Sequence, residues 1–256
     1  MRRIRLILEY DGTAYVGWQT QPNGVAVQQL VEEQLARVVG DRIAVHASGR
    51  TDSGVHALAQ VAHFDTNARM PADKFAFALN TGLPPDIRVR YSDEAPEGFH
   101  ARFDVKGKQY RYTIVTGPHA RAFLRNTALH VHGHIDEDKL RRAAKEIVGA
   151  HDFRAFMASG SSMENTVREI YRSEWTRQGS ILTYDVEGSG FLYNMVRILA
   201  GTMLDIAKGT LPETAMRAAL CSGNRSDAGA TAPAYGLALV RVRYDGFDTA
   251  EVLGED

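Results

Sequence analysis

Hydrophobic and polar positions recur with two different periods along the chain, and these periods predict strands and helices in a mixed order. Residues 3–10 alternate polar and apolar side chains of β-favouring types, which predicts a strand. In residues 25–39 Val and Leu instead recur at helical spacing and Gly40 follows, which predicts an amphipathic helix that ends there. The same patterns predict strands at residues 42–47, 55–64 and 87–91 and a second helix from Pro71 to Asn80.

The second part of the chain repeats this order of elements. The patterns predict a strand at residues 109–115, a helix at 136–148 capped by Asp136, a strand pair at 168–177 and 181–187, a long helix at 191–208 and a last strand at 235–244. Each half therefore has the order of a split βαβ unit. We expect an α+β fold of two RRM-like halves, residues 1–103 and 104–256, with a largely antiparallel sheet.

Composition narrows the class of protein. The 256 residues are 44% hydrophobic and 24% charged, which is ordinary for a globular chain. The single Cys221 excludes a disulfide framework and a Cys-based zinc cluster, and it favours a reducing compartment. No apolar run approaches the roughly 18 residues of a membrane span. These features predict a cytoplasmic protein.

Charge is distributed unevenly, although the net charge is only −1. The segment 99–128 holds one acid, Asp104, against six bases, namely Arg102, Lys106, Lys108, Arg111, Arg121 and Arg125. The tail after Tyr244 is acidic and contains Asp245, Asp248, Glu251, Glu255 and Asp256. A basic face offset by a distant acidic end is compatible with an RNA partner, and an ordinary solvated surface is the alternative interpretation.

Candidate chemistry centres on the most polar glycine-bounded turn of the chain, Gly49-Arg50-Thr51-Asp52-Ser53-Gly54. The two glycines permit unusual backbone dihedrals and close approach by a ligand. The residues alone leave a second interpretation open, in which Asp52 caps local backbone amides as an Asx turn.

Several segments resemble motifs of one enzyme family and occur in that family's order. They are residues 49–64, which begin with this turn and continue through Val55-His56 to Gln60-Val61-Ala62-His63-Phe64, then Asn80 with Leu83-Pro84, Phe99-His100-Ala101-Arg102-Phe103, Lys108-Gln109-Tyr110-Arg111-Tyr112, Gly190-Phe191-Leu192-Tyr193-Asn194-Met195-Val196-Arg197, and Thr231-Ala232-Pro233 with Gly236-Leu237. On these residues the chain resembles the tRNA pseudouridine synthase A family.

The resemblance implies a fold with helices on one side of the sheet and a central cleft, and it implies roles for particular residues. Asp52 would be the nucleophile, Tyr110 would stack on the target base and assist proton transfer, and Arg197 would pair with Asp52. Arg50 would fill the space left by a flipped nucleotide. The resemblance also implies contacts with tRNA for Arg102, Arg121 and Leu237. The family's activity is conversion of uridine to pseudouridine at positions 38 to 40 of the tRNA anticodon stem-loop, by a homodimer and without cofactor or metal.

This chemistry suits the residue types. Moving the bond at ribose C1′ from uracil N1 to C5 is an isomerisation, and it requires an ionised carboxylate that attacks sugar or base or removes a proton. An adjacent guanidinium favours the ionised form, and Arg can pair bidentately where Lys cannot. The sequence leaves open whether the carboxylate attacks C1′ or C6 or acts through a glycal.

Other interpretations of the same residues stay open at this point. Tyr110 and Tyr112 share a strand face, so one of them could simply be core, and Arg197 could be a solvated helix residue. His130, His132 and His134 alternate and could share one face of an edge strand, where a metal site is the rarer outcome. Two rival functions are an RNA-binding module without catalysis and a glycoside hydrolase, although the latter needs a second carboxylate. An RNA other than tRNA is a third alternative.

Overall fold

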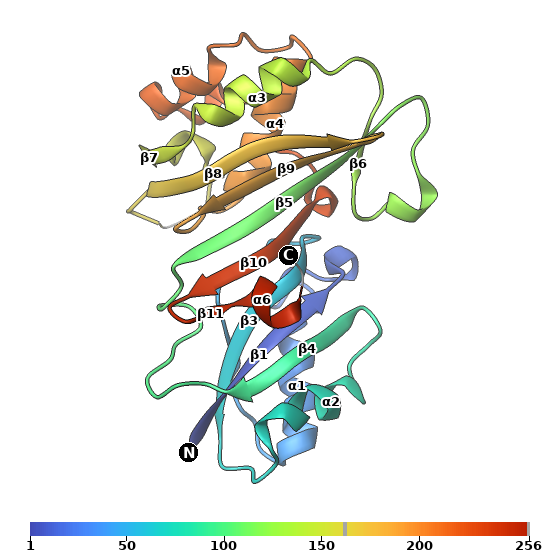
Figure 1. The fold of residues 1–256 in the computed structure, drawn as a ribbon, viewed down its shortest axis with the longest axis vertical. Coiled ribbons are helices and arrows are strands. Elements are labelled where there is room, and N and C mark those ends of the chain that lie inside the picture. Colours follow the sequence, from blue (N-terminus) through green and yellow to red (C-terminus); the bar gives the residue numbers. More distant parts are fainter. Residues whose placement is uncertain (161–162, 255–256) are drawn as a thin grey trace. The chain divides into compact units, whose positions relative to one another are not determined.

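The computed structural model describes residues 1–160 and 163–254. The chain divides into two compact units, Met1–Lys106 together with Ala238–Asp256, and Gly107–Leu237. Each unit combines strands with helices, which confirms the α+β class (Figure 1). The expected halves, residues 1–103 and 104–256, stay a prediction. The last long strand was expected in the second half, whereas residues 238–256 group with the first unit. Glu255 and Asp256 of the acidic tail lie outside the described residues.

The first unit is built on four hydrogen-bonded strands in the order β4-β1-β3-β10. Strands β1, β3 and β4 are antiparallel, whereas β10 runs parallel to β3 with Ala238 opposite His56. The short strands β2 and β11 pair antiparallel with β3 and β10, respectively. The bounds are β1 Arg2–Tyr10, α1 Val27–Val39, β2 His46–Ala47, β3 His56–Thr66, α2 Phe75–Asn80, β4 Ile87–Glu94, β10 Leu237–Tyr244, β11 Phe247–Asp248 and α6 Thr249–Leu253.

Both faces of β1 are covered by other residues. Its alternating pattern of polar and apolar residues would normally indicate one solvent-exposed face. Leu6 and Leu8 are fully buried on one face, and Ile7 is fully buried on the other. Arg5 shares the face of Ile7, and its guanidinium carbon lies 3.4 Å from the ring centroid of Phe247. Asp93 on β4 pairs with the same guanidinium. The C-terminal segment thus covers a face that the strand pattern alone leaves exposed.

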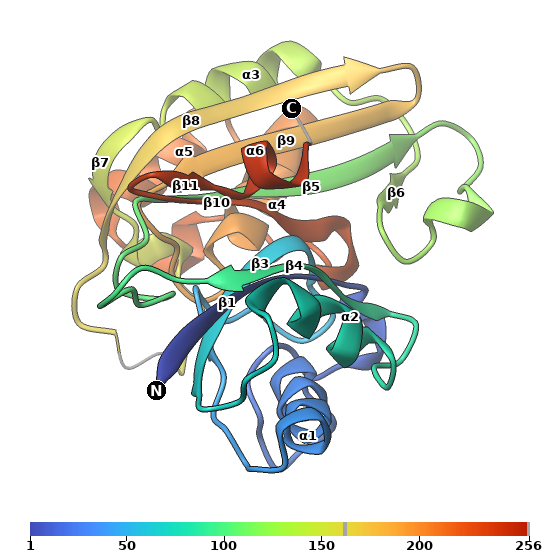
Figure 2. The same cartoon turned by 60° about the horizontal axis from the view of Figure 1, so that its bottom comes forward.

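Helices α1 and α2 lie together on one face of this sheet (Figure 2). Val27, Val31 and Leu35 form the fully buried stripe of α1. The helix ends where Gly40 takes the left-handed conformation with φ 85° and donates its N–H to the Ala36 carbonyl. The predicted end of this helix is therefore confirmed.

The second unit has an antiparallel sheet in the order β5-β9-β8-β7, and β6 runs parallel to β5. Its helices α3, α4 and α5 gather on one side of the strands (Figure 1). The bounds are β5 Gly107–Thr116, β6 Leu129–Val131, α3 Glu137–Lys145, β7 Gly149–Asp152, β8 Val167–Gln178, β9 Ile181–Gly188, α4 Met195–Ala207 and α5 Ala215–Ser222.

Helix α4 is the centre of this unit, because eleven of its thirteen residues are buried. Gly201 lets the extended segment 228–233 approach the helix, since a Cβ at that position would stand 1.8 Å from the Ala230 carbonyl oxygen. The Gly229 N–H donates to Thr202 Oγ1 at 2.9 Å, and the Ala232 N–H donates to the Arg197 carbonyl at 3.0 Å. This segment is therefore fixed along the helix that carries Arg197.

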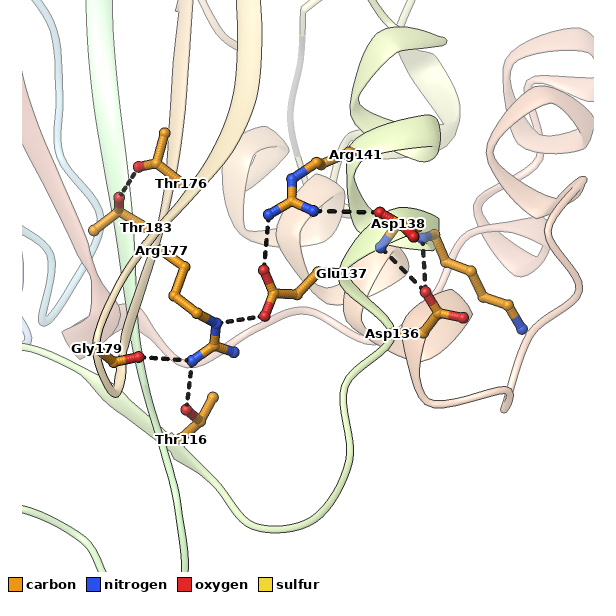
Figure 3. A network of polar contacts seen from close by, with 10 residues as sticks. Thr116, Asp136, Glu137, Asp138, Arg141, Thr176, Arg177, Gly179 and Thr183 are labelled. Atoms are coloured by element: carbon orange, nitrogen blue, oxygen red, sulfur yellow. Dashed lines mark hydrogen bonds and ion pairs between the residues drawn. The ribbon is translucent and has the colours of Figure 1, made fainter.

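A polar network ties α3 to the sheet at its exposed edge (Figure 3). Asp136 caps the helix, and its Oδ1 accepts the N–H groups of Asp138 and Lys139, each at 3.1 Å. Glu137 accepts from Arg141 at 2.8 Å and also pairs with Arg177 of β8. The predicted cap at Asp136 is confirmed.

Several predicted bounds were wrong, for physical reasons that lie outside local periodicity. Only His46–Ala47 of the expected strand at 42–47 pairs with a neighbour. The long helix begins at Met195 and not at residue 191, because residues 189–194 form an irregular approach to it. Helix α5 was missed. None of the helices in the part of the chain described has the length and apolar character of a membrane span.

Candidate functional site

The turn that carries Asp52 is held by backbone hydrogen bonds from a distant segment of the first unit. The Trp18 N–H donates to the Thr51 carbonyl at 3.1 Å, and the Tyr15 carbonyl accepts from the Gly54 N–H at 3.3 Å. Within the turn the Val55 N–H donates to the Asp52 carbonyl at 3.1 Å, and Gly54 has φ 76°. These bonds satisfy the backbone of a turn between strands and fix the backbone position of Asp52.

A buried polar network supports the same turn from the sheet side. The hydroxyls of Tyr10 and Thr51 lie 2.8 Å apart, and Gln60 donates from Nε2 to the Gly49 carbonyl at 2.8 Å. Ser48 completes the network by donating to Gln60 Oε1 at 2.6 Å. Burial raises the pKa of Tyr10 well above its usual value, so its phenol stays protonated. Because leaving one such group unpaired costs about 1–3 kcal/mol, the network resists rearrangement.

Gly17 makes the close approach of these two segments possible. Its φ is 103°, and a Cβ there would stand 2.5 Å from the Thr51 carbonyl oxygen and 3.1 Å from the Asp52 carbonyl carbon. The position therefore requires glycine both for its backbone conformation and for space. Sequence reasoning missed it, although a Gly-Trp pair in a loop was a usable signal.

Among the predicted residues of this unit, Asp52 and Arg50 share one turn and Arg102 lies on another loop. Asp52 is partly buried, whereas Arg50 is exposed. Arg102 is exposed beside Phe103, whose side chain is 75% exposed and whose ring stacks on His100 with centroids 4.2 Å apart. Asp52 is thus a carboxylate on a fixed turn, and a long cationic side chain of the same turn faces solvent.

Tyr110 and Tyr112 lie on the same face of β5, as expected, but only one is plainly part of the core. Tyr112 is fully buried, and its hydroxyl donates to the Pro233 carbonyl at 2.9 Å. Tyr110 is 8% exposed and meets Phe191 edge to face, with ring centroids 5.2 Å apart. Phe191 precedes α4, so it connects the Tyr110 strand to the helix that carries Arg197.

Arg197 is not the solvated helix residue that its pattern allowed. Its Nε donates to the Ala232 carbonyl at 2.7 Å, and its Nη1 donates to Asn194 Oδ1 at 2.7 Å. Asn194 has φ 59°, a left-handed conformation that Asn tolerates better than most residues. Two acceptors from different segments therefore orient one guanidinium. Sequence reasoning missed the part of Asn194, although the residue lies inside the motif that ends at Arg197.

The remaining predicted residues of the second unit have different environments. Arg121 is exposed in the loop between β5 and β6. Leu237 is only 4% exposed at the start of β10. It follows Gly236, where a Cβ would stand 2.6 Å from the Tyr112 ring. Leu237 is thus held next to the Tyr112 core cluster.

The basic segment at residues 99–128 is less basic than its sequence suggests. Lys106 pairs with Asp245 at 3.0 Å, and Arg111 pairs with the buried Asp185 at 3.0 Å. Arg102 and Lys106 belong to the first unit, and the other four bases belong to the second. The expectation of one basic face is therefore weakened by ion pairing within each unit.

Histidines gather at two places. His130 lies in β6, and its Nε2 is 2.9 Å from the Gly117 carbonyl oxygen. His63 is 1% exposed and accepts the Ala101 N–H at 3.2 Å, and burial lowers its pKa to about 4. Across residues 1–160 and 163–254 there is no cluster of three or more His, Cys, Asp or Glu side chains that could hold a metal ion.

Known proteins resemble this chain over nearly its whole length. A sequence model of the family described as tRNA pseudouridine synthase matches residues 6–104 and 143–245. The tRNA pseudouridine synthase A of Ruminiclostridium cellulolyticum is 46% identical over 245 residues, 95% of this chain and 100% of that protein. The enzyme of the same name from Bacillus pumilus is 45% identical over 95% of this chain and 99% of its own.

Among solved structures, a chain of the archaeal box H/ACA sRNP Nop10-Cbf5 complex aligns with a TM-score of 0.37 and 14% identity, over 79% of this chain and 42% of that one. A likeness of that size adds nothing to the assignment. The sequence matches, in contrast, extend over both units. The chain therefore belongs to the tRNA pseudouridine synthase A family, whose members isomerise uridine in tRNA.

Proposed function

We propose that this protein converts uridine to pseudouridine at positions 38 to 40 of the tRNA anticodon stem-loop, with Asp52 as the nucleophile. The observation that carries the proposal is the Asp52 turn. Its carboxylate is partly buried, and the Trp18 and Tyr15 backbones fix the turn from outside. A catalytic group needs this kind of preorganised support. A carboxylate that only capped its own turn would not need support from distant segments.

The reaction balances without oxidant, reductant or energy source. The bond from ribose C1′ to uracil N1 breaks, and a bond from C1′ to C5 forms. The hydrogen on C5 leaves as a proton, and N1 gains one. The proposal covers attack by Asp52 at C1′ or C6, or proton removal through a glycal, because each route uses an ionised carboxylate at the same place.

The guanidinium of Arg197 is the proposed partner that keeps Asp52 ionised. Its bonds to Ala232 and Asn194 hold it in one orientation. A guanidinium oriented in this way can present a planar fork of N–H groups to a carboxylate. An opposite charge at ion-pair distance lowers a carboxyl pKa.

Base flipping is the second element of the proposal. Extruding a nucleotide from its stack costs a few kcal/mol. The exposed Arg50 would fill the gap, and Tyr110 would support the flipped base. Stacking on an aromatic side chain contributes about 1–3 kcal/mol per base, which offsets most of that cost. We assign tRNA contacts to Arg102, Arg121 and Leu237.

We further propose that the enzyme acts as a cytoplasmic homodimer without cofactor or metal. Light scattering at working concentration should give twice the chain mass of 28.2 kDa. A monomeric mass under turnover conditions would contradict the dimer. Added chelator should leave the rate unchanged, and loss of activity would instead support a metal site.

The decisive experiment is release of tritium from C5-labelled uridine in an unmodified tRNA transcript. Native protein should release tritium. Asp52→Asn should bind the transcript and release none, because the amide is neither nucleophile nor base. Asp41→Asn, at an exposed position of the same unit, is the matched control and should behave as native. If the native protein bound the transcript but released no tritium, the proposed enzymatic activity would be contradicted and an RNA-binding module favoured.

Mapping the modified position by primer extension tests the finer part of the proposal. Modification at positions 38 to 40 alone supports it, and modification elsewhere in tRNA or in another RNA contradicts it. Arg50→Ala should lower turnover more than tRNA affinity, since the side chain acts only after flipping. An equal loss in both would reduce Arg50 to a phosphate contact.

A further inference from the structure

Arg168, near the start of β8, is a partly buried cation whose bonds stay within its own segment. Its Nη1 donates to the Asn165 carbonyl at 3.0 Å and to the Val167 carbonyl at 2.6 Å. Among the described residues no carboxylate lies within ion-pair distance of its guanidinium, whereas the half-buried Arg3 and Arg241 each pair with an aspartate. Burial lowers the pKa of Arg168, but a guanidinium stays charged at any working pH.

The Nε edge of this guanidinium faces a glycine turn. Gly190 lies just beyond the end of β9, and a Cβ there would be 3.7 Å from Arg168 Nε and 3.9 Å from its Cδ. Ser189 is exposed, and its Oγ already accepts the Glu169 N–H at 3.1 Å. Its hydroxyl hydrogen is therefore available for a ligand. A cation, a hydroxyl and an open glycine surface together form an anion-binding arrangement.

Strand register places this arrangement on the sheet face that carries Tyr110. Gly188 stands opposite Lys108 of β5 on one side and opposite Ile170 of β8 on the other. Alternate residues of a strand share a face, so Arg168 lies on the face of Ile170, and Tyr110 lies on the face of Lys108. Glu169 follows Arg168 directly and points to the opposite face. Its charge is therefore directed away from the proposed site.

Phe191 links the Ser189-Gly190 turn to Tyr110, the residue proposed to support the flipped base. It follows Gly190 directly and contacts the Tyr110 ring. An anion bound by Arg168 and the Ser189-Gly190 turn would thus lie next to Phe191, the residue whose ring contacts Tyr110. That neighbourhood suits a phosphate that adjoins a nucleotide held at Tyr110.

We infer that Arg168, with Ser189 and Gly190, binds a backbone phosphate of tRNA next to the target nucleotide. The inference rests on the proposed function for the identity of the RNA. The ionic contact itself depends only on the geometry of the second unit. Arg168 is a substrate-binding residue in this assignment and takes no part in bond making.

The test measures binding of an unmodified tRNA transcript as a function of salt, in an Asp52→Asn background that prevents turnover. Loss of one phosphate contact should lower the slope of log affinity against log salt by about 0.7–0.9. Arg168→Ala should show this and should weaken binding on the order of tenfold at low salt. Arg172→Ala is the matched control, because Arg172 is exposed on the same strand and paired with Glu174. It should leave affinity and slope unchanged.

A second variant separates anion binding from folding. Gly190→Ala keeps every charge, has no backbone penalty, and adds a methyl group at ordinary contact distance from Arg168. It should fold with an unchanged melting temperature and still weaken tRNA binding, because the methyl occupies the phosphate position. Unchanged affinity and slope in Arg168→Ala would overturn the inference, as would native binding by Gly190→Ala. Absence of tritium release by native protein would overturn the proposed function, whatever the salt slope.

Discussion

The two side chains at the centre of the proposal are held in opposite ways. Asp52 is fixed through the backbone of its turn, which the Trp18 N–H and the Tyr15 carbonyl hold from outside. Arg197 is fixed through its own guanidinium, which donates to the Ala232 carbonyl and to Asn194. The first arrangement depends on glycines and buried polar groups around the turn, and the second depends on a few side-chain contacts.

The difference matters for what a substitution can reveal. A carboxylate can only accept hydrogen bonds, and the backbone of the Asp52 turn is itself held by hydrogen bonds. A guanidinium has several N–H donors and can use some of them for support. Changes around Asp52 should therefore lower both stability and activity, whereas changes around Arg197 should lower activity alone.

The largest effect is expected for Gly17→Ala. The new Cβ would meet the Thr51 carbonyl oxygen at 2.5 Å in a backbone with φ 103°. Strain and overpacking together should cost about 4 kcal/mol in the free energy of unfolding. Activity of the remaining folded protein should fall as well, because the clash displaces the Asp52 turn. Urea unfolding and tritium release measure the two effects.

Gly40→Ala is the control for that prediction, since Gly40 also has a positive φ, 85°, but nothing lies within 4 Å of its Cβ position. It should cost only about 1–2 kcal/mol for the left-handed backbone and leave activity native. Equal destabilisation by both variants would show that Gly17 is required for its conformation alone.

Local pattern predicted much of this molecule, and the remainder depends on contacts between distant residues. The stripe of α1 and its end at Gly40 follow from helical periodicity and a local conformational preference. The parallel pairing of Ala238 with His56 joins residues far apart in sequence, so no local signal could place β10 in the first unit. The network of Tyr10, Thr51 and Gln60 is non-local in the same way.

The candidate site shows the same division. Motif resemblance singled out Asp52, Tyr110 and Arg197, but it did not say what holds them. Asn194 was missed because a left-handed dihedral is a property of the fold. Arg168 was missed because the absence of an acidic partner among the described residues is a property of the fold as well. Neither has a signature in composition or spacing.

The next effect in size concerns pH and the buried His63 of the first unit. Its pKa in the folded protein is about 4, below the ordinary 6.5, so the unfolded chain takes up the proton first as pH falls. The stabilising contribution is complete above pH 6.5 and is lost as pH drops toward 4, by about 2–3 kcal/mol. His63→Asn retains an acceptor for the Ala101 N–H and should flatten the pH dependence of urea unfolding. His119→Asn, at an exposed position, should not.

A smaller effect is expected for Asn194→Gly in the second unit. Glycine adopts φ 59° without strain, so stability should not fall, but Arg197 loses its 2.7 Å contact. Turnover should drop by about tenfold with KM for tRNA unchanged, as expected when one positioning hydrogen bond is removed. Steady-state tritium release separates kcat from KM. A raised KM at constant kcat would instead assign Asn194 to tRNA binding.

The smallest effect is expected at the polar network that joins α3 to β8 in the second unit (Figure 3). Asp136→Ala removes the cap that accepts two N–H groups of α3 and should cost about 1 kcal/mol in the free energy of unfolding. Turnover at 25 °C should stay native, because the contacts that fix the Arg197 guanidinium come from Ala232 and Asn194 and not from the cap of α3. A drop in kcat without a matching loss of stability would show that α3 supports α4 at Arg197, and the guanidinium would then depend on more of the fold than its two acceptors.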